Sequence, residues 1–61
     1  MTNVYDINGL LVSADNPPQA AEYANELGFT GYPRLIPRPT TWEKVDAATN
    51  SARAIAKMMS E

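Results

Sequence analysis

Pro33, Pro37 and Pro39 decide what the middle of this 61-residue chain can form. Proline lacks a backbone N–H, fixes φ, and pushes the residue before it out of helical geometry. No helix can therefore run through this segment. We expect residues 30–39 to form an extended arm with some polyproline II character, between an N-terminal and a C-terminal half.

The start of the N-terminal half carries a hairpin signal. Asn8-Gly9 lies between two runs of β-branched, aromatic and aliphatic residues. Asn-Gly favours the positive φ angles of a type I′ turn, which matches the twist of paired strands. The sequence therefore predicts a β-hairpin over residues 1–13.

A short helix is predicted next. Asn16 precedes Pro17, which is typical of an N-cap followed by proline at the first helical position. Gly28 supplies the residue that ends a helix in the left-handed conformation. We place this helix at residues 17–27.

The C-terminal half reads as a longer helix. Thr40 and Glu43 have the spacing of a capping box, in which each side chain binds the backbone N–H of the other residue. The helix is predicted to cover residues 41–59. The expected fold class is α+β: one small domain over residues 1–61, with a hairpin, a short helix, an extended proline-rich arm and a longer helix.

The residue inventory argues against an enzyme. The chain has no cysteine and no histidine, which removes thiol nucleophiles, catalytic triads and the common zinc sites. Glu22 and Glu26 lie one helical turn apart and could share a hard cation, but exposed glutamates at this spacing are ordinary on a solvated helix. We therefore expect no catalytic residue, no metal, no cofactor and no small-molecule substrate.

The charge and hydropathy of the chain argue against two further classes of partner, nucleic acid and membrane. The formal net charge is −2 and the five basic residues are scattered, so we expect no nucleic-acid binding. The longest strongly apolar run is Leu10–Val12, far shorter than the ~20 residues of a membrane helix. We expect no membrane segment and no signal peptide, and a place in the cytoplasm or in a virion.

Association with protein is the remaining expectation. A chain of this length buries only about 60% of its unfolded surface, and natural proteins of this size add disulfides, metals or oligomer contacts. Cysteine is absent, and alanine supplies much of the hydrophobic content of 44%. The sequence therefore favours docking onto a protein partner or onto copies of itself.

The proline-rich arm is the first candidate contact. Tyr32, Leu35 and Ile36 are its apolar anchors, and Arg34 and Arg38 would contact the rim of a groove in the partner. The alternative is a linker pinned against the protein's own helices.

The C-terminal helix is the second candidate. Val45, Ala48, Ala52, Ile55 and Met59 follow a 3-4-3-4 spacing that suits a helix pair. Packing against the first helix and the hairpin is an equally good use of this stripe. Trp42, just before it, is either an intermolecular anchor or the core of the domain. Trp42, Ile55 and Met59 are the predicted partner contacts on this helix.

The segment Tyr5-Asp6-Ile7-Asn8-Gly9 resembles hairpins of bacteriophage tail and minor structural proteins. The resemblance covers about ten residues, 3–12, and implies a virion component such as a capsid-associated or tail-associated protein. The expected function is thus structural: assembly by docking. The alternative is a small acidic inhibitor or regulator that binds one target protein.

Overall fold

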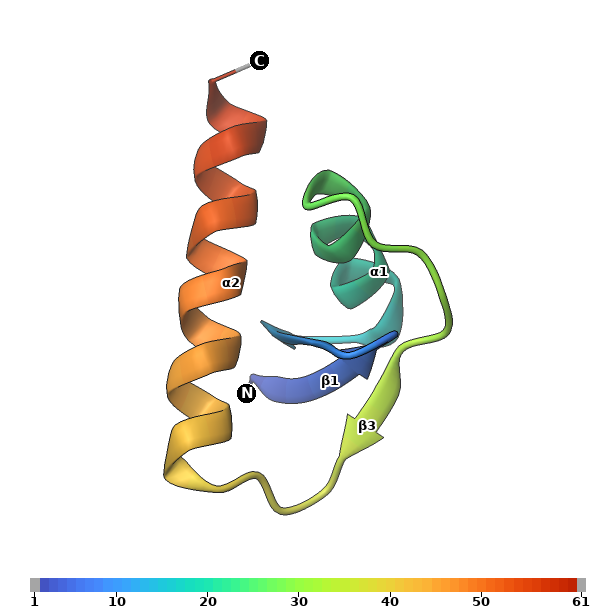
Figure 1. Cartoon of the computed structure of the whole chain (residues 1–61), viewed down its shortest axis with the longest axis vertical. Coiled ribbons are helices and arrows are strands. Elements are labelled where there is room, and N and C mark those ends of the chain that lie inside the picture. Colours follow the sequence, from blue (N-terminus) through green and yellow to red (C-terminus); the bar gives the residue numbers. More distant parts are fainter. Residues whose placement is uncertain (1, 61) are drawn as a thin grey trace.

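The computed structural model describes residues 2–60, which form a three-stranded antiparallel sheet and two helices (Figure 1). The elements are β1 (Asn3–Ile7), β2 (Leu10–Ala14), α1 (Pro17–Glu26), β3 (Arg34–Ile36) and α2 (Thr41–Met59). The strand order is β2-β1-β3. The predicted α+β class is confirmed.

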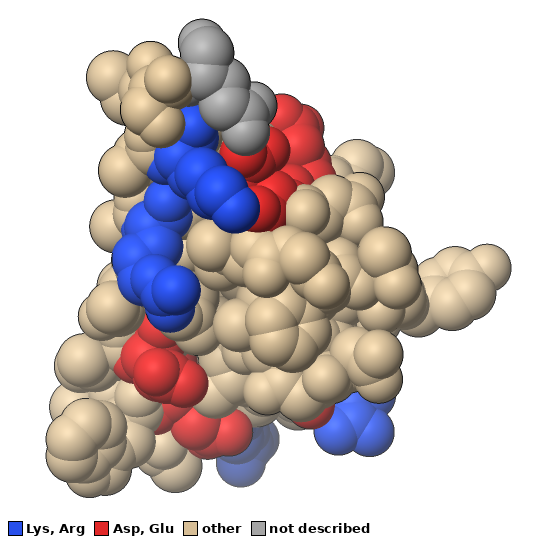
Figure 2. Space-filling view, turned by 45° about the horizontal axis from the view of Figure 1, so that its top comes forward, with Lys and Arg blue, Asp and Glu red and all other residues tan. Residues whose placement is uncertain are grey.

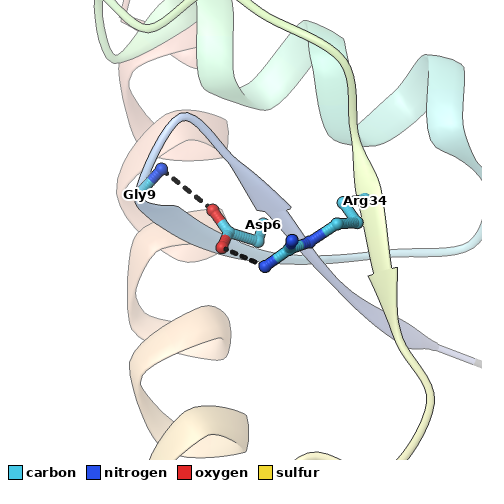
Figure 3. A network of polar contacts seen from close by, with 3 residues as sticks. All are labelled: Asp6, Gly9 and Arg34. Carbon is cyan, nitrogen blue, oxygen red and sulfur yellow. Dashed lines mark hydrogen bonds and ion pairs between the residues drawn. The ribbon is translucent and has the colours of Figure 1, made fainter.

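The hairpin forms as its turn residues require. Ile7 pairs with Leu10, so Asn8 and Gly9 are the two residues of the turn, with φ angles of 54° and 93°. The side chain of Asp6 accepts a hydrogen bond of 2.9 Å from the backbone N–H of Gly9 and so fixes the turn (Figure 3). The hairpin prediction is confirmed for the described residues, residue 1 of the predicted range lies outside them, and the second strand continues to Ala14, one residue beyond the predicted limit.

Both ends of α1 are capped. The Asn16 side chain accepts a bond of 2.9 Å from the N–H of Gln19. At the other end Gly28 has φ of 87°, and Phe29 donates its N–H to the carbonyl of Ala24 at 2.8 Å, as in a Schellman motif. The helix ends at Glu26, one residue earlier than predicted.

The start of α2 has the predicted capping box. Thr40 Oγ1 accepts from the N–H of Glu43 at 3.2 Å, and Glu43 Oε1 accepts from the N–H of Thr40 at 2.8 Å. The helix covers Thr41–Met59, as predicted.

The core lies between α1 and one face of the sheet. Its larger members alternate along the hairpin, as expected for strands with one buried face. The buried residues of this cluster are Tyr5, Ile7, Val12, Ala14, Ala20 and Ala24. Half of them are alanine, which fits the small core expected from the composition.

The predicted arm is partly a strand. Residues Arg34–Ile36 pair antiparallel with β1, with Val4 opposite Ile36 and Asp6 opposite Arg34. Alternation along β1 turns the backbone groups of Val4 and Asp6 away from β2, and β3 gives them partners. Arg34 also forms an ion pair of 3.5 Å with Asp6 (Figure 3). The arm is therefore pinned to the protein's own sheet, where we had expected a partner's groove or the protein's own helices.

The opposite edge of the sheet is closed by α2. Ser51 Oγ accepts from the N–H of Ser13 and donates to the carbonyl of Ser13, both at 2.7 Å. Asn50 Nδ2 donates to the carbonyl of Leu11 at 2.8 Å. Leu11 and Ser13 are the β2 residues whose backbone groups point away from β1. These bonds fix the rotation of α2 about its own axis.

Candidate functional site

The two sides of α2 differ in burial. Successive residues are about 100° apart around a helix axis, so residues three and four apart share a side. The buried inner face consists of Ala47, Asn50, Ser51 and Ala54. The 3-4-3-4 residues, called the outer stripe below, are Val45, Ala48, Ala52, Ile55 and Met59, all exposed. The outer stripe is centred about 130° around the helix axis from the inner face.

The exposure of the outer stripe decides between its two interpretations. Val45 is 51% exposed, Ile55 40% and Met59 82%, whereas Ala47 and Ala54 are completely buried. The stripe does not pack on α1 or on the hairpin, so the interpretation as intramolecular core is wrong. The interpretation as a contact for a partner stays a prediction.

Trp42 extends this apolar surface at the start of α2. It is 81% exposed, so it is not the core of the domain. With Thr41 and Val45 it lines a shallow depression of about 370 Å³. Thr41 was not among the predicted contacts, although it lies one turn before Val45 and continues the spacing of the outer stripe.

The residues predicted on the arm form a different surface. Tyr32 is 94% exposed and Leu35 51% exposed, and Arg34 and Arg38 are also exposed. Ile36 is half-buried beside Val4. Because β3 and α2 lie at opposite edges of the sheet, these residues do not join the outer stripe in one site (Figure 1).

The free edge of β3 offers little to a pairing strand. Pro33 and Pro37 flank the strand on both sides and have no N–H to donate. Within the strand, Leu35 is the residue whose backbone groups point away from β1. Short edge strands bounded by proline resist pairing with another chain, so strand addition here is not favoured.

A second apolar depression, of about 330 Å³, adjoins this edge. It is lined by Thr2, Asn3, Val4, Leu35, Ile36, Pro37, Pro39 and Lys44. Its apolar lining surrounds Val4, which is buried, and Ile36, which is half-buried. We assign this depression a structural role.

Charge is divided unevenly along α2. Its N-terminal half carries Glu43 and Asp46 against one lysine, and its C-terminal half carries Arg53 and Lys57 with no acid. Figure 2 shows the basic side chains together along one part of the helix and acidic ones beyond them. Lys57 also donates to the backbone carbonyl of Glu26 at 3.2 Å, which ties this part of α2 to the end of α1.

Residues 2–60 contain no group of three or more His, Cys, Asp or Glu residues able to hold a metal. Neither helix of that range is both long and apolar enough to cross a bilayer. No family model matches the chain, and no curated protein or solved structure matches it either.

Proposed function

We propose that this chain is a small structural or assembly protein that works by docking onto protein through the outer stripe of α2. The observation that carries the proposal is the exposure of Val45, Ile55 and Met59 on a helix whose inner face is already packed. Apolar side chains aligned along one helix face are a common way to recognise another helix or a groove.

The position of the outer stripe is fixed by the fold. Ser51 and Asn50 are hydrogen-bonded to β2, and a rotation of α2 that buried the stripe would break these bonds. Each backbone group left without a partner in a buried place costs about 1–3 kcal/mol. The chain therefore holds the stripe toward solvent, where it is accessible to a partner.

The outer stripe is the stronger of the two candidate surfaces. Arg34, Leu35 and Ile36 form the short edge strand β3, with side chains divided between the sheet and solvent, and Tyr32 and Arg38 lie outside that strand. The stripe and Trp42 instead form one apolar surface along a helix, and tryptophan is among the residues that most often dominate binding energy in interfaces. A place in a virion stays a prediction from the hairpin resemblance.

Site-specific photo-crosslinking in the cells that produce the protein tests the proposal. A photoreactive amino acid replaces Met59 on the outer stripe or, as the matched control, the exposed Glu22 on α1. We expect a discrete adduct from position 59, lost when Ala52→Asp is added, and none from position 22. No adduct at position 59, or the same adducts from both positions, would overturn the proposal.

The mass of the adduct also distinguishes the two kinds of docking protein. Assembly places many copies on one particle, so adducts should contain the chain itself or an abundant structural protein. A regulator of one target should give a single adduct with one copy of that target.

A further inference from the structure

The Asn8–Gly9 pair that closes the β1–β2 hairpin is also a chemically reactive sequence. An asparagine can lose its side-chain amide when the backbone nitrogen of the next residue attacks the side-chain carbonyl carbon. Glycine in that next position offers the least steric resistance, because it has no side chain. Asn8 and Gly9 are both exposed, so water reaches them. The sequence and the exposure of this turn therefore favour deamidation of Asn8.

The backbone of the folded turn holds the two reacting atoms apart. Asn8 is the one non-glycine residue in the range 2–60 with a positive φ, 54°, which places it in the left-handed conformation. Ring closure needs the Gly9 nitrogen and the Asn8 Cβ on the same side of the Cα–C bond of Asn8. At the ψ angles of the left-handed region, about 30–60°, the nitrogen lies nearly opposite Cβ. The ring cannot close until the turn opens.

The carboxylate of Asp6 adds a second constraint. Its Oδ1 accepts the hydrogen bond of 2.9 Å from the N–H of Gly9, and its Oδ2 pairs with Arg34 (Figure 3). The attacking nitrogen must lose its proton, and a hydrogen bond to a negatively charged oxygen favours the protonated nitrogen. Opening the turn also breaks this bond. Asp6 therefore opposes both the proton loss and the backbone rotation.

We propose that Asn8 is a site of spontaneous deamidation, which the folded turn and the Asp6 carboxylate keep unreacted. The only co-reactant is water. The Gly9 nitrogen bonds to Cγ of Asn8, and the side-chain amide leaves as ammonia with the proton that Gly9 lost. Water then opens the five-membered ring at one of its two carbonyl carbons, which leaves aspartate or isoaspartate at position 8. The outer stripe takes no part, so this inference and the proposed function fail separately.

The reaction would mark the chain permanently when the hairpin opens. Isoaspartate carries the backbone through the side-chain carbons, which lengthens the two-residue turn by one atom. Turn length sets the register of the hairpin, in which Ile7 pairs with Leu10. Ile7 is also completely buried in the core. We therefore expect chains with isoaspartate at position 8 to be less stable than unmodified chains.

Incubation of folded and denatured protein at the same pH and temperature tests the site. Peptide mapping by mass spectrometry measures amide loss at each asparagine. Asn16 is the internal control, because Pro17 has no N–H with which to attack. We expect Asn8 to react in guanidinium chloride and to react about tenfold or more slowly in buffer, since the folded hairpin must first open. No reaction of Asn8 in denaturant, or equal rates in the two solutions, would overturn the proposal.

Two variants in buffer test the role of Asp6. Asp6→Ala removes both the acceptor for Gly9 and the ion pair, whereas the matched control Arg34→Ala removes the ion pair and leaves the acceptor. We expect Asn8 to react about tenfold or more faster in Asp6→Ala, which is what losing a hydrogen bond to a charged group corresponds to. Arg34→Ala should react at nearly the rate of the unmodified protein. A slower reaction in Asp6→Ala would mean that the carboxylate acts as a base for Gly9, which contradicts the proposal.

A third variant keeps the test decisive if circular dichroism shows that Asp6→Ala does not fold. Asp6→Asn retains an oxygen acceptor of the same reach but removes the negative charge. In the folded variant, Asn8 should react faster than in the unmodified protein and more slowly than in the denatured chain. A rate no higher than that of the unmodified protein would overturn the role of Asp6.

Discussion

The inner and outer faces of α2 depart from the usual pattern, in which apolar side chains are buried and polar side chains are exposed. The inner face buries the polar Asn50 and Ser51, while the outer face leaves Val45, Ile55 and Met59 exposed. Both faces also carry alanine, so side-chain size does not separate them. The difference lies in hydrogen bonding, since the inner face meets the open edge of β2.

The comparison shows what orients a helix in a domain this small. The edge of β2 presents the carbonyl of Leu11 and both backbone groups of Ser13, and each has a partner on α2. These groups are partly buried, so leaving all three unpaired would cost a few kcal/mol in total, on the order of 1–3 kcal/mol, which is a large part of the stability of a small domain. The requirement for hydrogen bonds therefore outweighs the burial of the apolar stripe within one chain.

The largest expected effect is the difference in stability between two variants, each of which places an aspartate on one face of α2. Ala54→Asp puts a carboxylate at a completely buried position and should cost about 3 kcal/mol or more, enough to unfold most of the protein. Ala52→Asp, two residues away on the outer face, should cost less than about 1 kcal/mol, mainly from helix propensity. Urea unfolding followed by circular dichroism, at concentrations below those that favour association, measures both.

Each variant is the control for the other, because both replace an alanine of α2 with aspartate. Equal losses of stability in the two variants would show that the outer face is also packed within the monomer. The comparison of the two faces would then be wrong.

The sequence predicted the elements better than their packing. Asn8-Gly9, Gly28 and the Thr40–Glu43 capping box act locally, within a few residues, and the structure follows them. β3 was missed because it is short and lies between prolines, and because its pairing depends on the open edge of β1, about thirty residues earlier in the chain.

The candidate site was predicted in part for the same reason. The spacing of Val45, Ile55 and Met59 was visible in the sequence, but which side of α2 faces the sheet was not. That choice depends on Asn50 and Ser51 meeting β2, a contact between residues 38 or 39 positions apart. The sequence does show two polar residues, Asn50 and Ser51, beside the apolar stripe. Polar residues at these positions are equally consistent with a side of the helix that faces solvent, so they did not predict the contact with β2.

The second largest expected effect on stability comes from removing the side chain of α2 that bonds to the free edge of β2. Ser51→Ala removes the partner of both backbone groups of Ser13 and should lower the free energy of unfolding by about 1–2 kcal/mol, net of the better helix propensity of alanine. The matched control is Thr49→Ala, whose hydroxyl bonds only to the carbonyl of Val45 in its own helix.

Two measurements apply to these variants. Urea unfolding should show a loss for Ser51→Ala and little change or a gain for Thr49→Ala. Amide exchange at Ser13 should become faster in Ser51→Ala alone. Unchanged exchange at Ser13 would mean that the hydroxyl of Ser51 does not protect this edge.

The smallest expected effect on stability comes from the replacement of Trp42, which is the largest side chain in the sequence. Trp42→Ala should change the free energy of unfolding of the monomer by less than about 0.5 kcal/mol, because Trp42 is 81% exposed, whereas truncating a buried tryptophan would cost about 3–5 kcal/mol.

Trp42 is the single tryptophan of the chain, so the fluorescence of the unmodified protein reports on this position directly. In dilute protein, urea should unfold the helices seen by circular dichroism while the emission wavelength hardly moves. When a partner docks on the outer stripe, the emission should shift to shorter wavelength as the partner covers the ring, and Ala52→Asp should abolish that shift. A large emission shift on unfolding of dilute protein would place Trp42 in the core and remove it from the docking surface.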